Sequence, residues 1–462
     1  MVVFKKGEFI MKILIVGCGK IGSTLLSSFV SEGHDVVAID TLPEVITELT
    51  NIYDVMGICG NGVDSDILAE AGVKNADLFI AVTASDEFNM LSCFLAKKMG
   101  AKSTIARIRN PEYNDKSLSF IRKQLELSMS INPERLAARE LFNILKFPSA
   151  MKIERFSGRY LEMVEVRLKP DSVLDGIKLS ELRSKYEAKV LVCCVKRGEN
   201  TYIPDGNFVL QGDDRIGITG SPTEMQKIFK RLGLLTKQSK SVMILGGGKI
   251  AQYLADMLLS IGCNVKIIEQ NEAVALRLCE DLPNAVIIHG DGARQELLLE
   301  EGINNQDAFV SLTGSDEENI LISIFASSQG VPKSISKVNR DELASMADKL
   351  GVDTIISPRK IVSDLIVSYA RALQNSLGSN VESLYKLMDG DAEALEFNVK
   401  ADPRLTDIPL KALTLKKNIL IAGIIRDRKT IIPGGNDVIM AGDKVVVIAT
   451  GIKLSDLSDI LR

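Results

Sequence analysis

Short apolar runs alternate with amphipathic stretches along much of the chain. Runs rich in Val, Ile and Leu predict strands at 12–16, 35–39, 55–58, 78–82 and 104–108. The stretches between them have apolar residues at helical spacing, which predicts helices at about 20–31, 43–50, 65–71 and 86–99. Apolar strands separated by helices are typical of a parallel sheet covered on both faces. With right-handed crossovers, this is a doubly wound α/β fold.

The same pattern occurs twice. "KILIVGCGKIGSTLLSSFVSEGHDVVAID" (12–40) matches "SVMILGGGKIAQYLADMLLSIGCNVKIIE" (241–269), and "DLFIAVTASDEFNML" (77–91) matches "DAFVSLTGSDEENIL" (307–321). Later segments also repeat, as in "YIPDGNFVLQGDD" (202–214) and "IIPGGNDVIMAGD" (431–443). The repeat unit is roughly 230 residues long, and an α/β piece comes before a smaller piece with strand patterns, for instance at 188–197 and 444–450.

The repeat predicts four domains in two pairs. Two Rossmann-like, doubly wound parallel-sheet lobes are expected at 11–149 and 240–378, and each is followed by a small α+β lobe, at 150–234 and 379–462. Polar "LLTKQSKS" (234–241) is the expected linker between the halves. Residues 1–10 lack the features of a signal peptide and are either an upstream start or a frayed extension.

Each α/β piece closes with a further predicted helix, at 131–145 and 356–370. Asn132 and Ser357 are expected to cap these helices, because Pro133 and Pro358 suit the first helical position. The first of the two has an apolar stripe, formed by Leu136, Leu141, Ile144 and Leu145. This stripe packs either within its own domain or against the sister repeat or a partner subunit.

Composition narrows the class of protein. The net charge of −4 argues against nucleic-acid binding as a main role, and no apolar run approaches the roughly 18 residues that span a bilayer. The seven cysteines form no C-x-x-C pair and are expected to be reduced and packed like small apolar residues. The two histidines are far apart, so no metal site is predicted.

A glycine-rich loop at 17–22 follows the first strand and opens a helix, which is typical of dinucleotide binding. Gly17 permits the tight turn, Gly19 lets the backbone approach a pyrophosphate, and Gly22 lets helix and strand pack closely. Asp40, at the end of the second strand, can accept hydrogen bonds from a ribose diol and would repel a 2′-phosphate, so NAD(H) is favoured over NADP(H). The predicted first site also includes Cys18, Lys20 and Ile21.

The second repeat has an equivalent loop. Its predicted site consists of Gly246, Gly248, Lys249, Ile250, Ala251 and Glu269. Alanine in the third glycine position is compatible with the motif. Two interpretations stay open: a second nucleotide site, or a decayed repeat that keeps the fold without the ligand.

Further candidates follow later strands, whose carboxyl ends share one edge of the sheet. They are Thr83, Ser85 and Arg107 in the first repeat and Thr313 and Lys337 in the second. A cation at position 107 or 337 either meets phosphate charge or is a solvated surface group. Asp86 and Asp316 are expected as helix N-caps.

No catalytic residue is predicted. A dehydrogenase needs a group that moves a proton, but no tyrosine has lysine four residues later. Neither His34 nor His289 recurs in the other repeat, although the glycine loop does. The dinucleotide is therefore interpreted as a signal, which needs only binding that differs between two conformations.

The motifs "VGCGKIG" and "GGGKIA", the paired "TASDEFNM" and "TGSDEENI", and the paired Ile-Pro-x-Gly-Asn turns point to a family. From Met11 on, the chain resembles the NAD-binding peripheral (TrkA-type) subunits of Trk potassium uptake systems, which have two tandem RCK (KTN) modules. The resemblance implies a non-catalytic regulator on the cytoplasmic face of the cell membrane, docked on a separate potassium-translocating subunit and not inserted in the membrane. It also implies assembly of the modules into a ring, and control by NAD(H) and by ATP or ADP.

By motif match, the resemblance places the first nucleotide site at Gly17, Gly19, Gly22, Asp40 and Thr83, and the second at Gly246, Gly248, Glu269 and Thr313. It makes the two closing helices crossover helices between paired lobes. Ala251 and Glu269 depart from the family pattern, which leaves the second ligand open. Two other functions also stay open: an NAD-dependent oxidoreductase with a carboxylate or lysine base, and an RCK-type regulator of another cation channel or antiporter.

Overall fold

A computed structural model describes residues 10–110, 113, 115–147, 149–170, 172–187, 189–233, 239–352, 354–375, 381–454 and 456–462. The predictions for residues 1–9 and for most of the linker, 234–238, therefore lie outside the described residues. The chain forms two compact units. One unit holds the residues up to Phe142 together with Lys240–Ala370, and the other holds Asn143–Ser239 and Arg371–Arg462.

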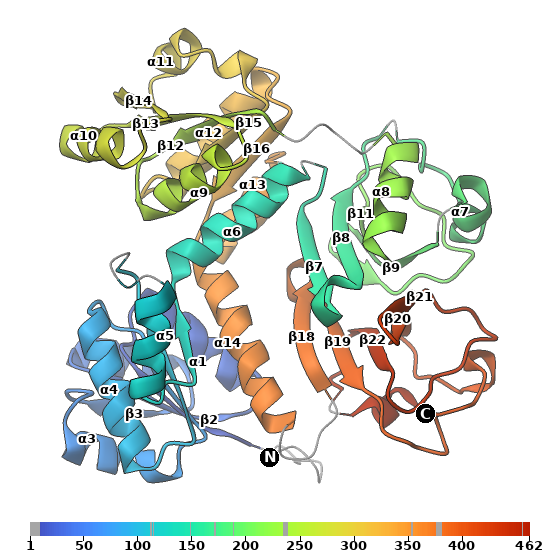
Figure 1. The fold of residues 1–462 in the computed structure, drawn as a ribbon, viewed down its shortest axis with the longest axis horizontal. Coiled ribbons are helices and arrows are strands. Elements are labelled where there is room, and N and C mark those ends of the chain that lie inside the picture. Colours follow the sequence, from blue (N-terminus) through green and yellow to red (C-terminus); the bar gives the residue numbers. More distant parts are fainter. Residues whose placement is uncertain are drawn as a thin grey trace. The chain divides into compact units, whose positions relative to one another are not determined.

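The first unit contains two parallel lobes, each built on a six-stranded sheet (Figure 1). In the first parallel lobe the strand order is β3-β2-β1-β4-β5-β6, the doubly wound order. Its strands are β1 (Lys12–Val16), β2 (Asp35–Asp40), β3 (Met56–Cys59), β4 (Leu78–Ala81), β5 (Ser103–Arg107) and β6 (Met129–Ile131). Its helices are α1 (Lys20–Ser31), α2 (Pro43–Ile52), α3 (Ser65–Glu70), η1 (Val73–Asn75), α4 (Asp86–Met99), α5 (Asp115–Gln124) and α6 (Pro133–Lys146).

The second parallel lobe repeats this topology, with the order β14-β13-β12-β15-β16-β17. Its strands are β12 (Ser241–Leu245), β13 (Asn264–Glu269), β14 (Val286–His289), β15 (Ala308–Ser311), β16 (Lys333–Lys337) and β17 (Thr354–Ile356). Its helices are α9 (Lys249–Leu259), α10 (Glu272–Asp281), α11 (Gln295–Glu300), η3 (Ile303–Asn305), α12 (Asp316–Ser328), α13 (Asp341–Lys349) and α14 (Pro358–Asn375).

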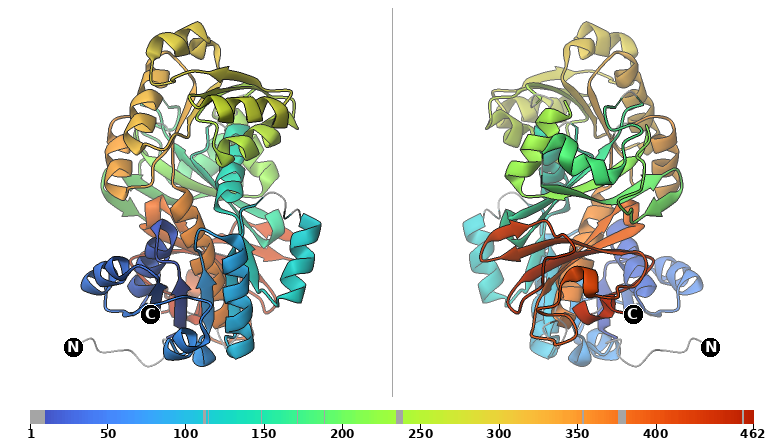
Figure 2. Two further views of the ribbon diagram at one scale, coloured as in Figure 1. Left: turned by 90° about the vertical axis from the view of Figure 1, so that its left-hand side faces the viewer. Right: turned by 90° about the vertical axis from the view of Figure 1, so that its right-hand side faces the viewer.

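Both faces of each parallel sheet are covered, as continuous apolar strands require (Figures 1 and 2). In β1, Leu14 and Val16 pack in a cluster with residues of α4, while Ile13 and Ile15 are buried on the other face. The predicted strands and helices are confirmed to within about two residues, except that α14 runs further, to Asn375. Strands β6 and β17 were not predicted, because these edge strands have three residues each and are too short to show a hydrophobic period.

The helices that close the parallel lobes begin as predicted. Asn132 Oδ1 accepts a hydrogen bond from the Arg135 backbone at 2.9 Å, and Ser357 Oγ accepts one from Lys360 at 3.4 Å. The apolar stripe of α6 is largely buried. At the start of α6, the Asn132 amide donates to the Tyr253 hydroxyl at 3.3 Å, so this end contacts the sister repeat.

The second unit contains two antiparallel lobes, with the strand orders β10-β9-β11-β8-β7 and β18-β19-β22-β20-β21. The first consists of β7 (Lys152–Phe156), η2 (Ser157–Arg159), β8 (Leu161–Arg167), α7 (Leu179–Tyr186), β9 (Val190–Arg197), β10 (Asn200–Tyr202), β11 (Arg215–Gly220) and α8 (Pro222–Arg231). The second consists of β18 (Val381–Leu387), η4 (Met388–Gly390), β19 (Ala392–Asn398), η5 (Leu410–Ala412), β20 (Ile419–Arg426), β21 (Lys429–Ile431), β22 (Lys444–Thr450) and η6 (Leu457–Ile460).

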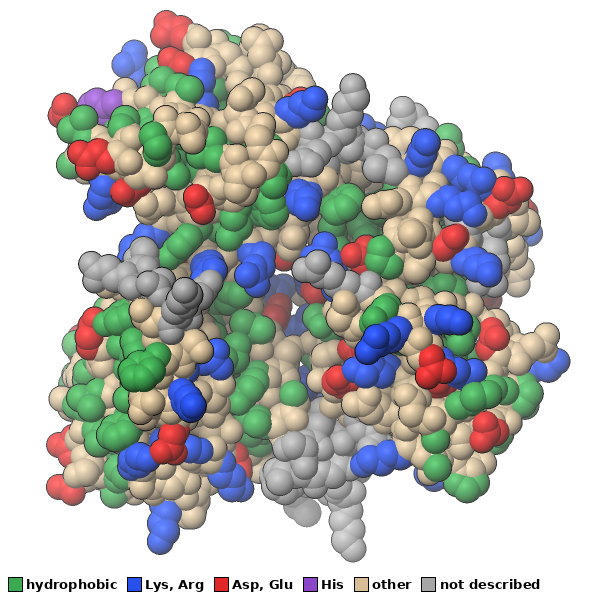
Figure 3. All heavy atoms as spheres, in the orientation of Figure 1, with side chains coloured by type: hydrophobic (Ala, Val, Ile, Leu, Met, Phe, Trp, Pro, Cys, Tyr) green, Lys and Arg blue, Asp and Glu red, His purple; other side chains and the backbone are tan. Residues whose placement is uncertain are grey.

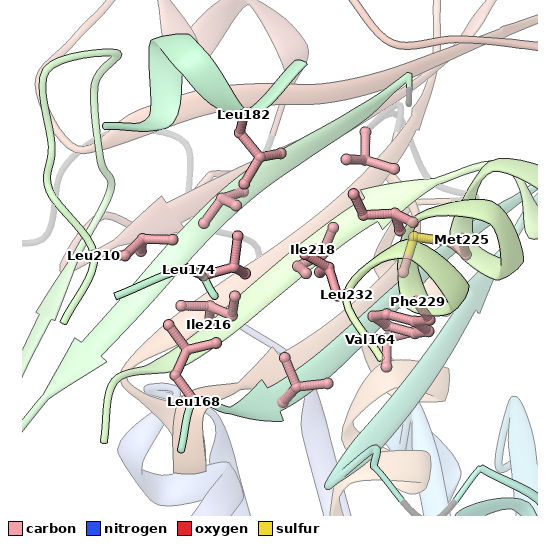
Figure 4. Packing of buried hydrophobic residues seen from close by; sticks show 14 of the residues in the cluster. Val164, Leu168, Leu174, Leu182, Leu210, Ile216, Ile218, Met225, Phe229 and Leu232 are labelled. Carbon is pink, nitrogen blue, oxygen red and sulfur yellow. The ribbon is translucent and has the colours of Figure 1, made fainter. Parts of the chain in front are cut away.

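Each antiparallel lobe has its own core, and the two lobes share a third. In the first, Met225 and Phe229 of α8 pack over Val164 and Ile218 of the sheet (Figure 4). The shared cluster joins residues such as Phe156 and Cys194 of the first lobe to others of the second. The Cys194 thiol is fully buried there, which raises its pKa well above the ordinary value and makes it a packing residue.

An ion-pair network around the buried Arg215 and Glu165 also joins the two antiparallel lobes. Arg215 contacts Glu165 at 3.2 Å and Asp389 of the second lobe. Glu165 in turn accepts a hydrogen bond from the Met388 backbone at 3.1 Å.

Within the described part of the chain, no helix is long and apolar enough to cross a membrane.

Candidate functional site

A cavity of about 660 Å³ lies at the carboxyl edge of the first parallel sheet and extends to the second parallel lobe. Strands β2 and β3 are added to one side of β1, and strands β4 to β6 are added to the other side. Ligands of doubly wound folds bind at the switch point between these two directions, here between β1 and β4. The first lobe contributes Val16, Gly17, Gly19, Lys20, Ile21, Ile39, Asp40, Thr41, Gly60, Gly62, Val82, Thr83, Ala84, Phe88, Arg107, Pro133 and Glu134. The second contributes Ile250, Gly314, Lys337, Asn339, Pro358 and Arg359. We call this space the inter-lobe cavity.

The first glycine loop, Gly17–Gly22, turns closely between β1 and α1. Gly17 has φ +88°, and a Cβ placed on it would lie 2.8 Å from the Thr83 methyl group. A Cβ on Gly22 would lie 2.0 Å from the Gly17 carbonyl oxygen. A Cβ on Gly19 would meet nothing within 4 Å, and no side chain caps α1. The loop thus leaves space and free helix N–H groups beside Gly19, which fits a pyrophosphate.

Asp40 holds this loop in place. Its Oδ2 accepts from the Cys18 backbone at 2.7 Å and its Oδ1 accepts from Leu42 at 3.0 Å. Each oxygen keeps further acceptor capacity on the cavity side, so the carboxylate is free to bind a ribose diol as well. Cys18 is buried and does not line the cavity, and burial and the neighbouring Asp40 carboxylate raise the pKa of its thiol to about 12.

Thr83 reaches the cavity because Asn89 fixes the end of β4. Asn89 is fully buried, and its Oδ1 accepts from both the backbone and the hydroxyl of Thr83, at 2.8 and 2.7 Å. Its amide donates to the Thr83 and Arg107 carbonyls, which ties the ends of β4 and β5 together. Asn89 was not predicted, although the same asparagine recurs as Asn319 with equivalent bonds to the backbone.

The prediction that Asp86 and Asp316 cap their helices is wrong. The caps are Ser85, which accepts from Phe88, and Ser315, which accepts from Glu318. Asp86 Oδ2 instead accepts from the Arg109 and Asn110 backbones at 2.8 and 2.7 Å. Asp316 makes the equivalent bonds in the second lobe. The short serine side chain reaches the helix N–H, which leaves the buried aspartate to hold the loop after β5 or β16.

Four cations from both lobes line the inter-lobe cavity: Lys20, Arg107, Lys337 and Arg359. Burial lowers the pKa of Lys337, and the like charges of Lys20 and Arg359 lower it further. Burial and Arg109 likewise lower the pKa of Arg107, whose Nε is buried without a hydrogen-bond partner in the described chain. Two carboxylates, Asp40 and Glu134, line the same cavity, so its charge is net positive. An anion would relieve this repulsion.

Arg359 and Glu134 were not predicted. They stand at equivalent places, directly after the prolines that open α14 and α6, where a helix start gives no hint of ligand contact. Glu134 lies 3.5 Å from Arg109, and its Oε2 is buried without a hydrogen-bond partner in the described chain. Neither His34 nor His289 lines the cavity.

The second glycine loop, Gly246–Ala251, repeats the backbone geometry of the first. Gly246 has φ +94°, and Glu269 accepts from the Gly247 and Asn271 backbones at 2.6 and 2.7 Å. Of this predicted second site, only Ile250 and Lys337 line the inter-lobe cavity; Gly246, Gly248, Lys249, Ala251, Glu269 and Thr313 do not. In the first site, Cys18, Gly22 and Ser85 also lie outside it.

Known proteins are similar to this chain over nearly its whole length. The TrkA-N domain profile matches residues 13–122 and 242–358, and the TrkA-C domain profile matches 163–233 and 394–462. The chain is 31% identical over 455 residues to the Trk system potassium uptake protein TrkA homolog 1 of Methanosarcina mazei, covering 97% of this chain and 99% of that protein. It is 29% identical to the Trk system potassium uptake protein TrkA of Haemophilus influenzae, covering 95% of each.

Among solved structures, the GsuK channel bound to NAD matches with a TM-score of 0.63 and 16% sequence identity, over 97% of this chain and 78% of that one. At this identity the match concerns the fold, and it confirms the predicted fold class.

Proposed function

The chain belongs to the TrkA family, and from this membership we propose that it is a regulatory subunit of a Trk-type potassium uptake system. In this proposal it binds NAD(H) and adenine nucleotides in the inter-lobe cavity and controls a separate membrane subunit that translocates potassium ions. The observation that carries the ligand assignment is the open backbone at Gly19 facing a cluster of cations from both lobes.

The residues of the cavity suit the parts of such a ligand. The Asp40 carboxylate would accept hydrogen bonds from the adenosine ribose, and the first turn of α1 would donate to the pyrophosphate. Arg107 and Lys337 would compensate the phosphate charge. The NAD-bound GsuK channel supports a dinucleotide as one ligand of this fold.

Regulation follows from the position of the cavity between two lobes. A ligand that touches both lobes favours the arrangement in which their groups converge. At 100 times its dissociation constant, such a ligand stabilises the competent state by about 2.7 kcal/mol. This free energy is of the size of typical allosteric couplings, about 1–3 kcal/mol.

We further propose that the chain acts on the cytoplasmic face of the cell membrane and that its modules assemble into a ring. The names of the TrkA relatives support the potassium-transport setting. Exposed apolar residues on α4, α5, α12 and α13 support self-association: Leu91, Phe120, Leu321 and Met346.

Calorimetric titration of the full chain with NADH, NAD⁺, ATP and ADP tests the ligand assignment. We expect binding below millimolar concentration, and the Asp40→Ala variant should bind about 10- to 100-fold more weakly, because it loses charge-assisted hydrogen bonds. Asp66→Ala, an exposed carboxylate on α3, is the control and should bind normally. Absence of binding by all four nucleotides would contradict the proposal, and steady turnover of NADH with a small carbonyl compound would support an oxidoreductase instead.

The regulatory part is tested by potassium flux through the membrane partner, measured with and without nucleotide. We expect the flux to respond to nucleotide with the wild-type chain and to lose that response with Asp40→Ala. A pull-down that recovers a different cation channel or an antiporter would replace the Trk-type partner.

A further inference from the structure

The two glycine loops share their backbone geometry, but a side chain beside them differs in charge between the two copies. Phe88 lines the inter-lobe cavity next to the first loop. The matching residue of the repeat, three after the serine that caps the following helix, is Glu318. A neutral ring in one copy is therefore a carboxylate in the other.

The Glu318 carboxylate lies against the residue that faces the second loop. The Thr313 hydroxyl donates to Glu318 Oε2 at 3.0 Å, whereas the equivalent Thr83 hydroxyl donates to the amide oxygen of Asn89. Thr313 borders the second loop closely, because a Cβ on Gly246 would lie 3.2 Å from its backbone nitrogen. A carboxylate thus lies beside the second loop where the first copy has the neutral ring of Phe88.

Two cations of the second lobe face the other site. Lys337 and Arg359 belong to the second lobe, yet both line the inter-lobe cavity with the first glycine loop. The carboxylate that acts on the pKa of Lys337 is Asp316. No ion pair within the described part of the chain includes Glu318, which is half-buried. An approaching phosphate would therefore meet an uncompensated carboxylate.

We infer that the two glycine loops have diverged: the first receives the phosphates of one nucleotide, with cations from both lobes, and Glu318 excludes nucleotide phosphates from the second. This inference rests on the proposed function for the identity of the ligand. It makes Glu318 the residue that determines specificity at the second loop. The full chain then binds one nucleotide, although it carries the dinucleotide motif twice.

Titration of the full chain with NADH and, separately, with ADP in the absence of divalent cations counts the sites. We expect one site per wild-type chain. Glu318→Gln removes the charge at nearly constant size and should add a second site, with an affinity at least about tenfold above that of the second loop in the wild type. Glu317→Gln is the matched control, because it makes the same charge change at the next residue, whose side chain pairs with Arg340.

The reciprocal variant Phe88→Glu places a carboxylate beside the first loop and should remove the wild-type site. Circular dichroism and thermal unfolding confirm that each variant is folded. Two sites in the wild type, or one site that survives Phe88→Glu, would overturn the inference. If the wild type binds no nucleotide, the proposed function fails at the first loop. The exclusion of phosphate by Glu318 then still stands if Glu318→Gln gains a site, and it falls if the variant gains none.

Discussion

The glycines of the first loop meet different physical constraints. Gly22 lies where any Cβ would collide with the Gly17 carbonyl, while Gly19 faces open space at φ −66°, a value that every residue adopts. The dinucleotide motif therefore combines a glycine that the fold requires with one that only the ligand requires. These two requirements can be separated by substitution.

Gly22→Ala should lower the free energy of unfolding by about 1–3 kcal/mol, because the added methyl group overpacks a rigid turn. Gly19→Ala should change it by less than about 1 kcal/mol but abolish nucleotide binding, because the methyl group fills the phosphate position. Urea unfolding and calorimetric titration of both variants measure the two effects. Equal loss of stability in both variants would contradict this separation.

The charge of Lys337 gives the site a pH dependence. Its pKa is lowered from the ordinary value of 10.5 by burial and like charge, so it loses its proton at a lower pH than an exposed lysine does. A bound anion favours the protonated form, and affinity should therefore fall as pH rises through the alkaline range toward 10.5. Titration of NADH binding at several pH values measures this fall. Lys337→Arg, which stays charged, should flatten the profile; an unchanged profile would assign the titration to another group.

At the level of single residues, the sequence predicted the site residues that follow strands, and it did not predict those whose position depends on tertiary contacts. Gly17, Gly19, Asp40, Thr83 and Arg107 follow strands whose carboxyl ends share one edge, so their convergence was predictable. Asn89 and Arg359 are helix residues. The role of Asn89 depends on the strand ends that it contacts, and the role of Arg359 depends on the lobe that it faces. Strand order and lobe docking are long-range properties that local patterns do not encode.

Among the elements, α4 and α5 of the first parallel lobe show an apolar face to solvent. Leu91 and Phe120 are exposed there, and apolar side chains gather over these helices in Figure 3. The second parallel lobe repeats this feature with Leu321 on α12 and Met346 on α13. Contiguous exposed apolar surface on a folded domain is typical of an interface between proteins.

The double variant Leu91→Ser with Phe120→Ser should reduce the oligomeric state of the chain while leaving the fold intact, because neither residue is part of the core. Size-exclusion chromatography with light scattering measures the mass. Ile52→Ser, which removes an equally exposed apolar residue at the end of α2, is the control and should not change it. A wild-type chain that is monomeric at micromolar concentration would contradict the proposed ring.

The elements themselves were largely predictable because their period is local. Strands such as β1 and β4 are unbroken apolar runs, and α4 has a serine cap before a helical apolar pattern. Beyond the parallel lobes, only part of the pattern was clear, namely β9 and β22, since short antiparallel strands joined by turns give weaker signals. The two-unit grouping, in which like lobes associate across the repeat, was outside the reach of periodicity.

At the scale of the whole molecule, residues from both copies of the repeat line the inter-lobe cavity. Lys20 and Arg107 come from one half and Lys337 and Arg359 from the other, and Ser28 and Ser363 join the same lobes by a 2.8 Å hydrogen bond. The cavity therefore brings together residues separated by most of the chain length.

Nucleotide should slow amide hydrogen exchange in both parallel lobes, including β16 and the start of α14. At 100 times the dissociation constant the protection should correspond to about 2.7 kcal/mol. Arg359→Ala should keep the slowing around the first glycine loop and lose it at the start of α14. Exchange measured by mass spectrometry tests this, and slowing confined to the first lobe in the wild type would contradict a ligand shared between the lobes.

Two of the four cations that line the cavity come from the second copy of the repeat, which bears on what the duplication achieved. Lys337 and Arg359 belong to the same polypeptide as the first glycine loop, so they reach the cavity without an encounter between two molecules. A single-repeat ancestor would have had to recruit those charges from a neighbouring molecule, and its nucleotide affinity would have depended on protein concentration. Under the proposed function, fusion of the two copies makes nucleotide affinity independent of protein concentration.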